Sequence, residues 1–399
     1  MKPNSFFWKY TSVLCLLFAV TFPIDYSVIP RTFSVVNPFF ENLIYWSGTG
    51  IFGLENNFST VISSDSIGLY IHVFNLLFLS LLLTFIWQII QSNKPVNLRK
   101  YFFCISTYFL VLMLFKYGFD KVFKVQFYTP EPNTLFTNLG DLSPDILYWS
   151  AIGSSWGYSF FLGAVEVLVA VLLLFKKTRL LGILLGIGVM VNVVVINFSY
   201  DISVKVYASF LLGLFLLNLL PYAKFLYRVL VLNRTSEMKQ EKPLFFTKNK
   251  LWNYGIKSIL VLFILTESLF PFVKSGNYND DTFSRPVFHG AYQVTNQNKE
   301  ENNQNISQIF IHRQGYFITK TTKNKMQDYH LIVDTVNRVL KISRYDLNES
   351  YILNYEEKNK TLFRIIGEIK SKKIDVFLDK INLKNLPIKQ SSFHWTTDH

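Results

Sequence analysis

The sequence predicts a mainly α-helical, polytopic transmembrane bundle of about seven spans, followed by a C-terminal all-β antiparallel domain. Half of the chain is hydrophobic and only 17% is charged, whereas soluble domains usually carry about a quarter charged residues. Long apolar runs dominate residues 1–275, and short segments that alternate apolar and polar residues occur in residues 276–399. The first pattern is typical of membrane spans and the second of half-buried strands.

Seven apolar runs carry the prediction of the bundle, because a transmembrane helix needs about 20 predominantly apolar residues. The first run lies within residues 6–23 and follows Lys2 and Lys9. No small-residue cleavage site follows it, so we expect an uncleaved anchor rather than a signal peptide. The other runs are residues 67–90, 101–117, 157–175, 180–198, 204–220 and 252–272.

Charged residues in the loops predict the orientation of the bundle. Loops 93–100, 176–179 and 224–250 are predominantly basic, whereas loops 25–66 and 126–156 contain mostly acidic residues. Short basic loops stay in the cytoplasm. We therefore expect a multi-pass protein of the bacterial inner membrane with a cytoplasmic N-terminus and a periplasmic C-terminal domain. A nucleic-acid partner is not expected, because much of the basic excess behind the net charge of +13 lies in these loops.

Alternating residues indicate the fold of the C-terminal domain. Residues 308–312 and 329–333 alternate, or nearly alternate, apolar and polar side chains between short polar turns. This pattern predicts an antiparallel meander, and we expect a small sandwich or a half-barrel. The Asn- and Lys-rich residues 296–305 are interpreted as a flexible loop. The histidines of this domain are scattered, so no metal site is predicted.

The loop 126–156 contains the start of a helix. Ser143 supplies an N-cap and Pro144 the first helical position. Aromatic residues follow at Tyr148 and Trp149. We expect a short amphipathic helix here.

Ionisable residues inside the spans are the candidate site, because such residues are expensive in a bilayer and normally face the interior of the bundle. Glu166 lies near the predicted midplane, where an unpaired carboxyl would stay protonated and could donate a hydrogen bond to a carbonyl. Further polar residues fall in the outer half of the predicted bundle. They are Asn192, Asn197, His72, Asp201, Lys205, Asp120 and Lys116.

The outer half of the predicted bundle contains these polar residues, whereas the inner half is almost purely apolar apart from its basic rim. This difference predicts a polar pocket that opens toward the periplasmic side. The alternative is a set of interfacial charges that extend to the membrane surface, which suits the lysines better than Glu166. These lysines are Lys116, Lys121 and Lys205. Asp201 and Lys205 are four residues apart and could form an ion pair. Cys15 and Cys104 lie in apolar runs without a C-x-x-C pair, so a redox role would need a bound cofactor or a partner protein.

Four motifs carry a family resemblance. They are KYGFDKVF at residues 116–123, GDLSP at 140–144, GAVE at 163–166 and LLLFKKTRLLG at 172–182. The sequence resembles the DoxX-like family of integral membrane proteins. The resemblance implies a four-helix core over about residues 100–221, with Glu166 as its intramembrane acid and a basic inner turn. The flanking spans and the β-domain are similar to longer bacterial members, and relatives include a subunit of thiosulfate:quinone oxidoreductases.

Three functions follow from these observations as hypotheses. The first is a quinone- or lipid-binding subunit of a redox-linked envelope complex, in which Glu166, Asn192 and Asn197 contact a non-covalently bound quinone. The alternative is a non-enzymatic scaffold or assembly factor that recruits an envelope partner through its β-domain. A transporter is the third, although no pair of broken helices in symmetric halves is visible. Whether the protein is an enzyme stays open.

Overall fold

The computed structural model describes residues 5–22, 27–28, 37–90, 98–235, 237, 250–295, 306–344, 349–359, 362–370, 372–390 and 396. The chain divides into two compact units. The helical unit contains Met1–Gln126 and Ser159–Tyr278, and the barrel unit contains Phe127–Tyr158 and Asn279–His399. Sequence analysis placed a boundary after residue 275 and left residues 127–158 with the helices, whereas the structure groups those residues with the strands.

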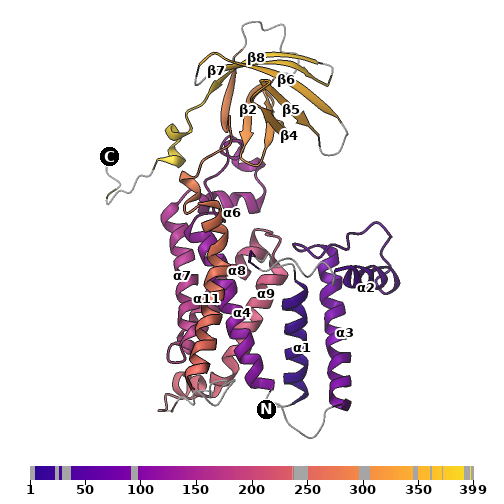
Figure 1. The fold of residues 1–399 in the computed structure, drawn as a ribbon, viewed down its shortest axis with the longest axis vertical. Coiled ribbons are helices and arrows are strands. Elements are labelled where there is room, and N and C mark those ends of the chain that lie inside the picture. Colours follow the sequence, from indigo (N-terminus) through magenta and orange to yellow (C-terminus); the bar gives the residue numbers. More distant parts are fainter. Residues whose placement is uncertain are drawn as a thin grey trace. The chain divides into compact units, whose positions relative to one another are not determined.

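Apolar helices long enough to cross a membrane make up the helical unit (Figure 1). The long helices are α3 Ile67–Ile90, α4 Leu98–Val122, α7 Trp156–Leu174, α8 Arg179–Ser199, α9 Lys205–Leu219 and α11 Lys250–Ser275. The α9 stretch continues through the short helix α10 (Ala223–Leu226) to Val231. By length and composition the described residues hold six candidate spans, so the predicted helical bundle is confirmed.

The N-terminal region differs from the prediction in two ways. The first predicted span forms α1 (Phe6–Thr21), a helix of 16 residues. At 1.5 Å per residue it is about 24 Å long, which is shorter than a hydrocarbon core of about 30 Å. The predicted loop 25–66 contains a further helix, α2 (Asn37–Gly50), whose short apolar stretch is interrupted by Glu41 and Asn42.

Helix α4 forms the core of the helical unit. Its side chains Leu110, Val111 and Met113 are at most 2% exposed. The other helices present apolar side chains outward, for example Phe78 on α3 and Ile259 on α11, which are 59% and 70% exposed. Such an apolar exterior would be unfavourable in water and suits a lipid environment.

Eight antiparallel strands in sequence order form a closed barrel in the other unit (Figure 1). The strands are β1 Gly290–Thr295, β2 Ile306–His312, β3 Tyr316–Thr321, β4 Met326–Asp334, β5 Val339–Ser343, β6 Ser350–Glu357, β7 Leu362–Ile369 and β8 Lys372–Lys380. The predicted antiparallel β-domain is confirmed, but the expected sandwich or half-barrel is wrong, because β1 pairs with β8 from Tyr292 to Thr295. The predicted flexible loop 296–305 lies outside the described residues.

Residues 127–158 cover part of the outside of the barrel. They form α5 (Pro132–Leu135), the 3₁₀ turn η2 (Leu139–Asp141) and α6 (Pro144–Gly153). The helix predicted after Ser143 is confirmed, but the Ser143 side chain does not cap its backbone, because the hydroxyl donates to the carboxylate of Asp145 instead. Large apolar side chains fill the barrel interior, including Leu340, Leu353 and Leu378, all fully buried. On the outer face, Phe136 stacks on Phe310 of β2, with ring centroids 5.7 Å apart.

Candidate functional sites

Glu166 of α7 forms a buried ion pair with Lys121 of α4, and the two charged atoms lie 2.8 Å apart. Two glycines permit this close helix crossing, because a Cβ at Gly163 would lie 2.5 Å from the carbonyl oxygen of Gly118. Ser159 adds a hydrogen bond from its hydroxyl to the carbonyl oxygen of Lys121, at 3.0 Å. The unpaired, protonated Glu166 expected from the sequence is wrong, because Lys121 is its cationic partner.

Lys116 and Glu267 form a second ion pair, 3.2 Å long, between α4 and α11. The carboxylate of Glu267 is fully buried and accepts hydrogen bonds from the backbone N–H groups of Ser27 and Val28. This acid therefore connects three parts of the helical unit. Glu267 falls within the predicted run 252–272, and the sequence does not indicate its partners, which lie about 150 and 240 residues earlier.

The expected pair of Asp201 and Lys205 is present at 2.7 Å. Asp201 precedes α9 in a left-handed conformation, with φ of 51°. Asp65 joins the pair, because its carboxylate accepts from the backbone N–H groups of Lys205 and Val206 at 2.8 and 3.1 Å. An acid at this position satisfies the free N–H groups of the first turn and interacts favourably with the helix dipole.

The remaining predicted residues lie in separate environments. His72 is buried on α3 and its Nε2 lies 2.8 Å from the hydroxyl of Thr21. Asn197 is buried, Asn192 is exposed, and Asp120 is half-buried. The contacts of the described residues thus divide the eight candidates among several helix junctions, and none of the eight lines the two cavities described next.

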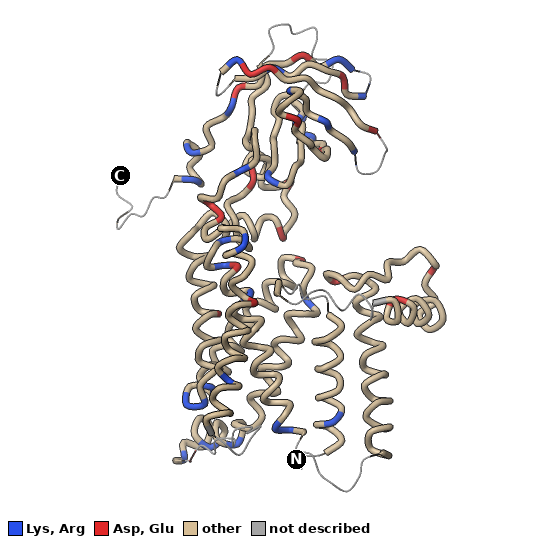
Figure 2. Tube along the Cα trace, viewed as in Figure 1, with Lys and Arg blue, Asp and Glu red and all other residues tan. Residues whose placement is uncertain are grey.

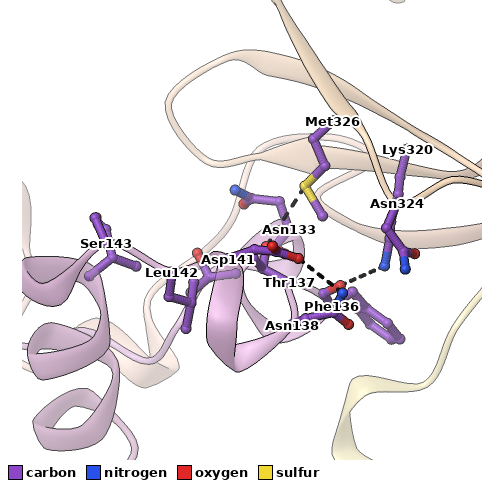
Figure 3. A pocket seen from close by; sticks show the side chains of 12 residues that line it. Asn133, Phe136, Thr137, Asn138, Asp141, Leu142, Ser143, Lys320, Asn324 and Met326 are labelled. Atoms are coloured by element: carbon purple, nitrogen blue, oxygen red, sulfur yellow. Dashed lines mark hydrogen bonds between the residues drawn. The ribbon is translucent and has the colours of Figure 1, made fainter.

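A polar cavity of about 410 Å³ lies in the barrel unit, between the α5–α6 segment and the turn that joins β3 to β4 (Figure 3). Volumes of roughly 300–1,000 Å³ are usual for small-molecule sites. The polar part of its lining consists of Asn133, Thr134, Thr137, Asn138, Asp141, Ser143, Lys320 and Asn324. This site is not visible in the sequence, because its residues lie in a loop and a hairpin that are about 180 residues apart and the helix-start motif in the loop does not indicate a cavity.

Glu131 holds the first helix of this cavity in place. Its carboxylate is 4% exposed and pairs with Arg313, at 2.9 Å from the guanidinium Nε and 3.2 Å from the backbone nitrogen. His289 lies 3.0 Å away and His312 lies 3.8 Å away. Because α5 begins at the next residue, Pro132, this buried acid fixes α5 to the barrel.

The same cluster predicts that acid destabilises the barrel unit. Burial alone would raise the pKa of Glu131, but the hydrogen bond from His289 and the charges of His312 and Arg313 lower it below its usual 4.5. Burial lowers the pKa of His312 below its usual 6.5. Both groups bind protons more readily in the unfolded state, so stability falls as the pH drops below about 6.5 and again through the carboxylate range.

Hydrogen exchange of the full-length protein between pH 7.5 and 4.5, corrected for the intrinsic pH dependence of exchange, measures this loss. We expect the protection of β1 and β2 to fall toward low pH. In the His312→Gln variant the loss between pH 6.5 and 5 should be smaller, because the titrating imidazole is absent. Equal acid sensitivity in the variant and the parent would contradict the assignment to His312.

An apolar cavity of about 210 Å³ lies in the helical unit, where side chains of α1, α3, α4 and α9 meet. Leu16 and Ile105 at its rim are 56% and 59% exposed. The hydroxyls of Ser12 and Ser106 in its lining already bond to the protein, through the carbonyl oxygen of Trp8 and the side chain of Asn218. The chemistry of this groove suits a segment of hydrocarbon chain.

Among the described residues, no group of three or more His, Cys, Asp and Glu side chains is arranged to hold a metal ion. The chain is similar to a protein of Bacillus subtilis (strain 168) that is named uncharacterized protein YwoB. The two are 32% identical over 120 residues, which cover 28% of this chain and 70% of that protein. No family model matches the sequence, and no solved structure matches it significantly.

Proposed function

Because the chain belongs to the family of YwoB, whose name assigns no activity, we propose a function from the geometry of its own sites. The protein is a non-enzymatic membrane scaffold that presents a ligand-binding barrel unit on the outer side of the bacterial inner membrane. The polar cavity between α5 and the β3–β4 turn is the observation that carries this proposal. The intramembrane charges support it as well, because they pair with one another across helices and act as structural contacts.

The distribution of charge supports the proposed orientation. Figure 2 shows Lys and Arg gathered at one end of the helical unit, at the start of α4 and in the turn between α7 and α8. The residues concerned include Arg99, Lys100, Lys176, Lys177 and Arg179. Basic loops favour the cytoplasm, so the opposite ends of these helices, where α4 leads to Phe127, are assigned to the periplasm.

Photo-cross-linking in intact cells tests this function. A photoreactive residue at Asn324, in the exposed β3–β4 turn at the cavity, should give a discrete adduct with an envelope component. The matched control is Val336, which is 90% exposed in the β4–β5 turn at the other end of β4. Equal labelling at the two positions, or none at either, would contradict the proposal that the cavity face is the binding face.

A lipid- or quinone-binding role is the second candidate, and the apolar groove between α1 and α4 favours it. The resemblance to the DoxX-like family agrees with a quinone, and the adjacent basic end of α4 agrees with an anionic lipid. A quinone and an anionic lipid share a long hydrocarbon tail, which is the part that the groove would bind. This binding can coexist with the scaffold function, because the two cavities belong to different units.

Filling the groove should displace such a tail. Ala19 of α1 lines the groove, so Ala19→Phe should lower the amount of co-purifying lipid or quinone at least several-fold in native mass spectrometry. Leu82→Phe, at a position that is 57% exposed on α3, is the control for added bulk on a lipid-facing surface. The mass of the displaced molecule distinguishes a quinone from a phospholipid, and unchanged occupancy in Ala19→Phe would remove this candidate.

A further inference from the structure

One cation and one anion line the barrel-unit cavity, and both already form hydrogen bonds within the protein. Lys320 donates a hydrogen bond from Nζ to the carbonyl oxygen of Phe136, at 2.7 Å. Asp141 accepts a hydrogen bond from the side-chain amide of Asn138, at 3.0 Å. The lining therefore lacks the convergent cations that a phosphate or sulfate group requires. A ligand without net charge fits this electrostatic environment.

Amide and hydroxyl groups make up most of the remaining polar lining. Asn133, Asn138 and Asn324 each offer donors and an acceptor, and Thr134 and Thr137 add hydroxyls. The side-chain oxygen of Asn133 is buried and has no hydrogen-bond partner in the protein. Protein atoms cover this oxygen, so the polar groups that face the cavity are the side-chain N–H groups of the asparagines and the threonine hydroxyls. The ligand must therefore carry several hydrogen-bond donors and acceptors close together.

Apolar side chains complete the cavity. Phe136, Met326, Leu142 and Ile146 contribute to its lining, and Leu142 lies toward α6 (Figure 3). The ring of Phe136 is held by its stacking on Phe310, and the sulfur of Met326 lies 3.8 Å from the hydroxyl of Thr137. The cavity thus combines apolar walls with groups that hydrogen-bond at their edges. A pyranose ring has the complementary character, with C–H faces and hydroxyl edges.

We propose that this cavity binds an uncharged glycan segment, with the amides of Asn133 and Asn138 and the hydroxyl of Thr137 contacting its polar substituents. The inference rests on the proposed function, because it names the ligand of the same barrel-unit cavity. An acetamido sugar fits best, since its carbonyl oxygen can accept from a side-chain amide of the lining while its methyl group contacts the apolar walls. The periplasmic position proposed for the barrel unit would give it access to envelope glycans.

Calorimetric titration of the full-length protein in mild detergent tests the proposal. The probes are the β-1,4-linked tetramer of N-acetylglucosamine, maltotetraose and an uncharged tetrapeptide of Ser, Thr and Asn. We expect saturable binding of the acetamido tetramer, weaker binding of maltotetraose, and none of the peptide. Tight binding of the peptide alone, or no saturable binding of either saccharide, would overturn the glycan assignment.

Two near-isosteric variants locate the binding. Asn133→Leu and Thr137→Val remove hydrogen-bonding groups with little change in shape, and each should weaken tetramer binding at least tenfold. Asn385→Leu, in the exposed 3₁₀ turn after β8, should leave it unchanged. Hydrogen exchange of β1–β3 confirms that the variants stay folded, and binding that both cavity variants leave intact would contradict the site.

The two experiments distinguish a failure of the glycan inference from a failure of the proposed scaffold function. A discrete protein adduct from the residue placed at Asn324, without saccharide binding, would overturn the glycan inference and leave the scaffold function standing. Saccharide binding that Asn133→Leu abolishes would support both. Absence of both the adduct and the saccharide binding would overturn the glycan inference and the scaffold function.

Discussion

The Glu131→Gln variant is expected to lose about 3 kcal/mol or more of barrel-unit stability, because breaking a buried ion pair typically costs ~3–5 kcal/mol. The substitution keeps the size of the side chain and removes the charge that faces Arg313, His289 and His312. Arg313 keeps its ion pair with Asp280, at 2.6 Å, so the barrel should remain folded. The loss should appear mainly as loosening of the segment that begins at Glu131.

Hydrogen exchange of the full-length protein measures this effect segment by segment. About 3 kcal/mol corresponds to roughly a hundredfold larger opening equilibrium, and we expect it in α5 and at the start of β1. The matched control is Asp375→Asn, which breaks the Arg364–Asp375 pair in the same unit. Its two side chains are 32% and 30% exposed, and such a pair contributes only about 0–1 kcal/mol. Equal effects of the two substitutions would contradict the structural role of Glu131.

Glu131 also shows why this site could not be predicted from the sequence. It lies in a loop beside Pro130 and Pro132, without periodicity or a motif. Its partners His289 and Arg313 follow 158 and 182 residues later. The one available signal was an isolated acid among apolar and aromatic residues near Phe127 and Tyr128, where a buried charge requires a partner. That signal does not say which partner the fold supplies.

The spans were predictable because a bilayer demands about 20 apolar residues in sequence, and the C-terminal strands because alternation reports a half-buried surface. Closure of the barrel was not predictable, since it depends on pairing between β1 and β8, which lie about 85 residues apart. Local patterns are identical for an open sheet and a closed barrel. The grouping of residues 127–158 with the strands was not predictable for a similar reason, because it depends on contacts such as that of Phe136 with Phe310.

The ionisable residues within the spans can be recognised in the sequence, but their partners cannot. Glu166 is a ligand candidate from the sequence because it has no cation near it along its own span. Lys121, interpreted as an interfacial lysine, turns back toward it across a glycine contact between α4 and α7. Such pairings depend on which helix faces contact each other, and hydropathy along the sequence does not show this. An intramembrane acid therefore indicates a buried site without distinguishing an ion pair from a ligand contact.

A double-mutant cycle on Lys121 and Glu166 should show strong coupling. Lys121→Met leaves the Glu166 carboxylate without its cation, and Glu166→Leu leaves the Lys121 ammonium without its anion. Each single substitution should lower the free energy of unfolding by about 3–5 kcal/mol. The double variant replaces the pair by apolar side chains of similar size, so it should be markedly more stable than the sum of the singles implies. We expect a coupling free energy of about 2–3 kcal/mol in unfolding by a denaturing detergent.

The control and the possible outcomes separate a structural role from a ligand role. Asp201→Asn breaks an ion pair whose acid is 84% exposed and should cost less than about 1 kcal/mol. Additive effects of the two single substitutions would show that the Lys121–Glu166 contact does not stabilise the helical unit. If Glu166→Gln instead left stability unchanged and removed a bound quinone, Glu166 would be a ligand contact and the scaffold function would lose its support from the intramembrane charges.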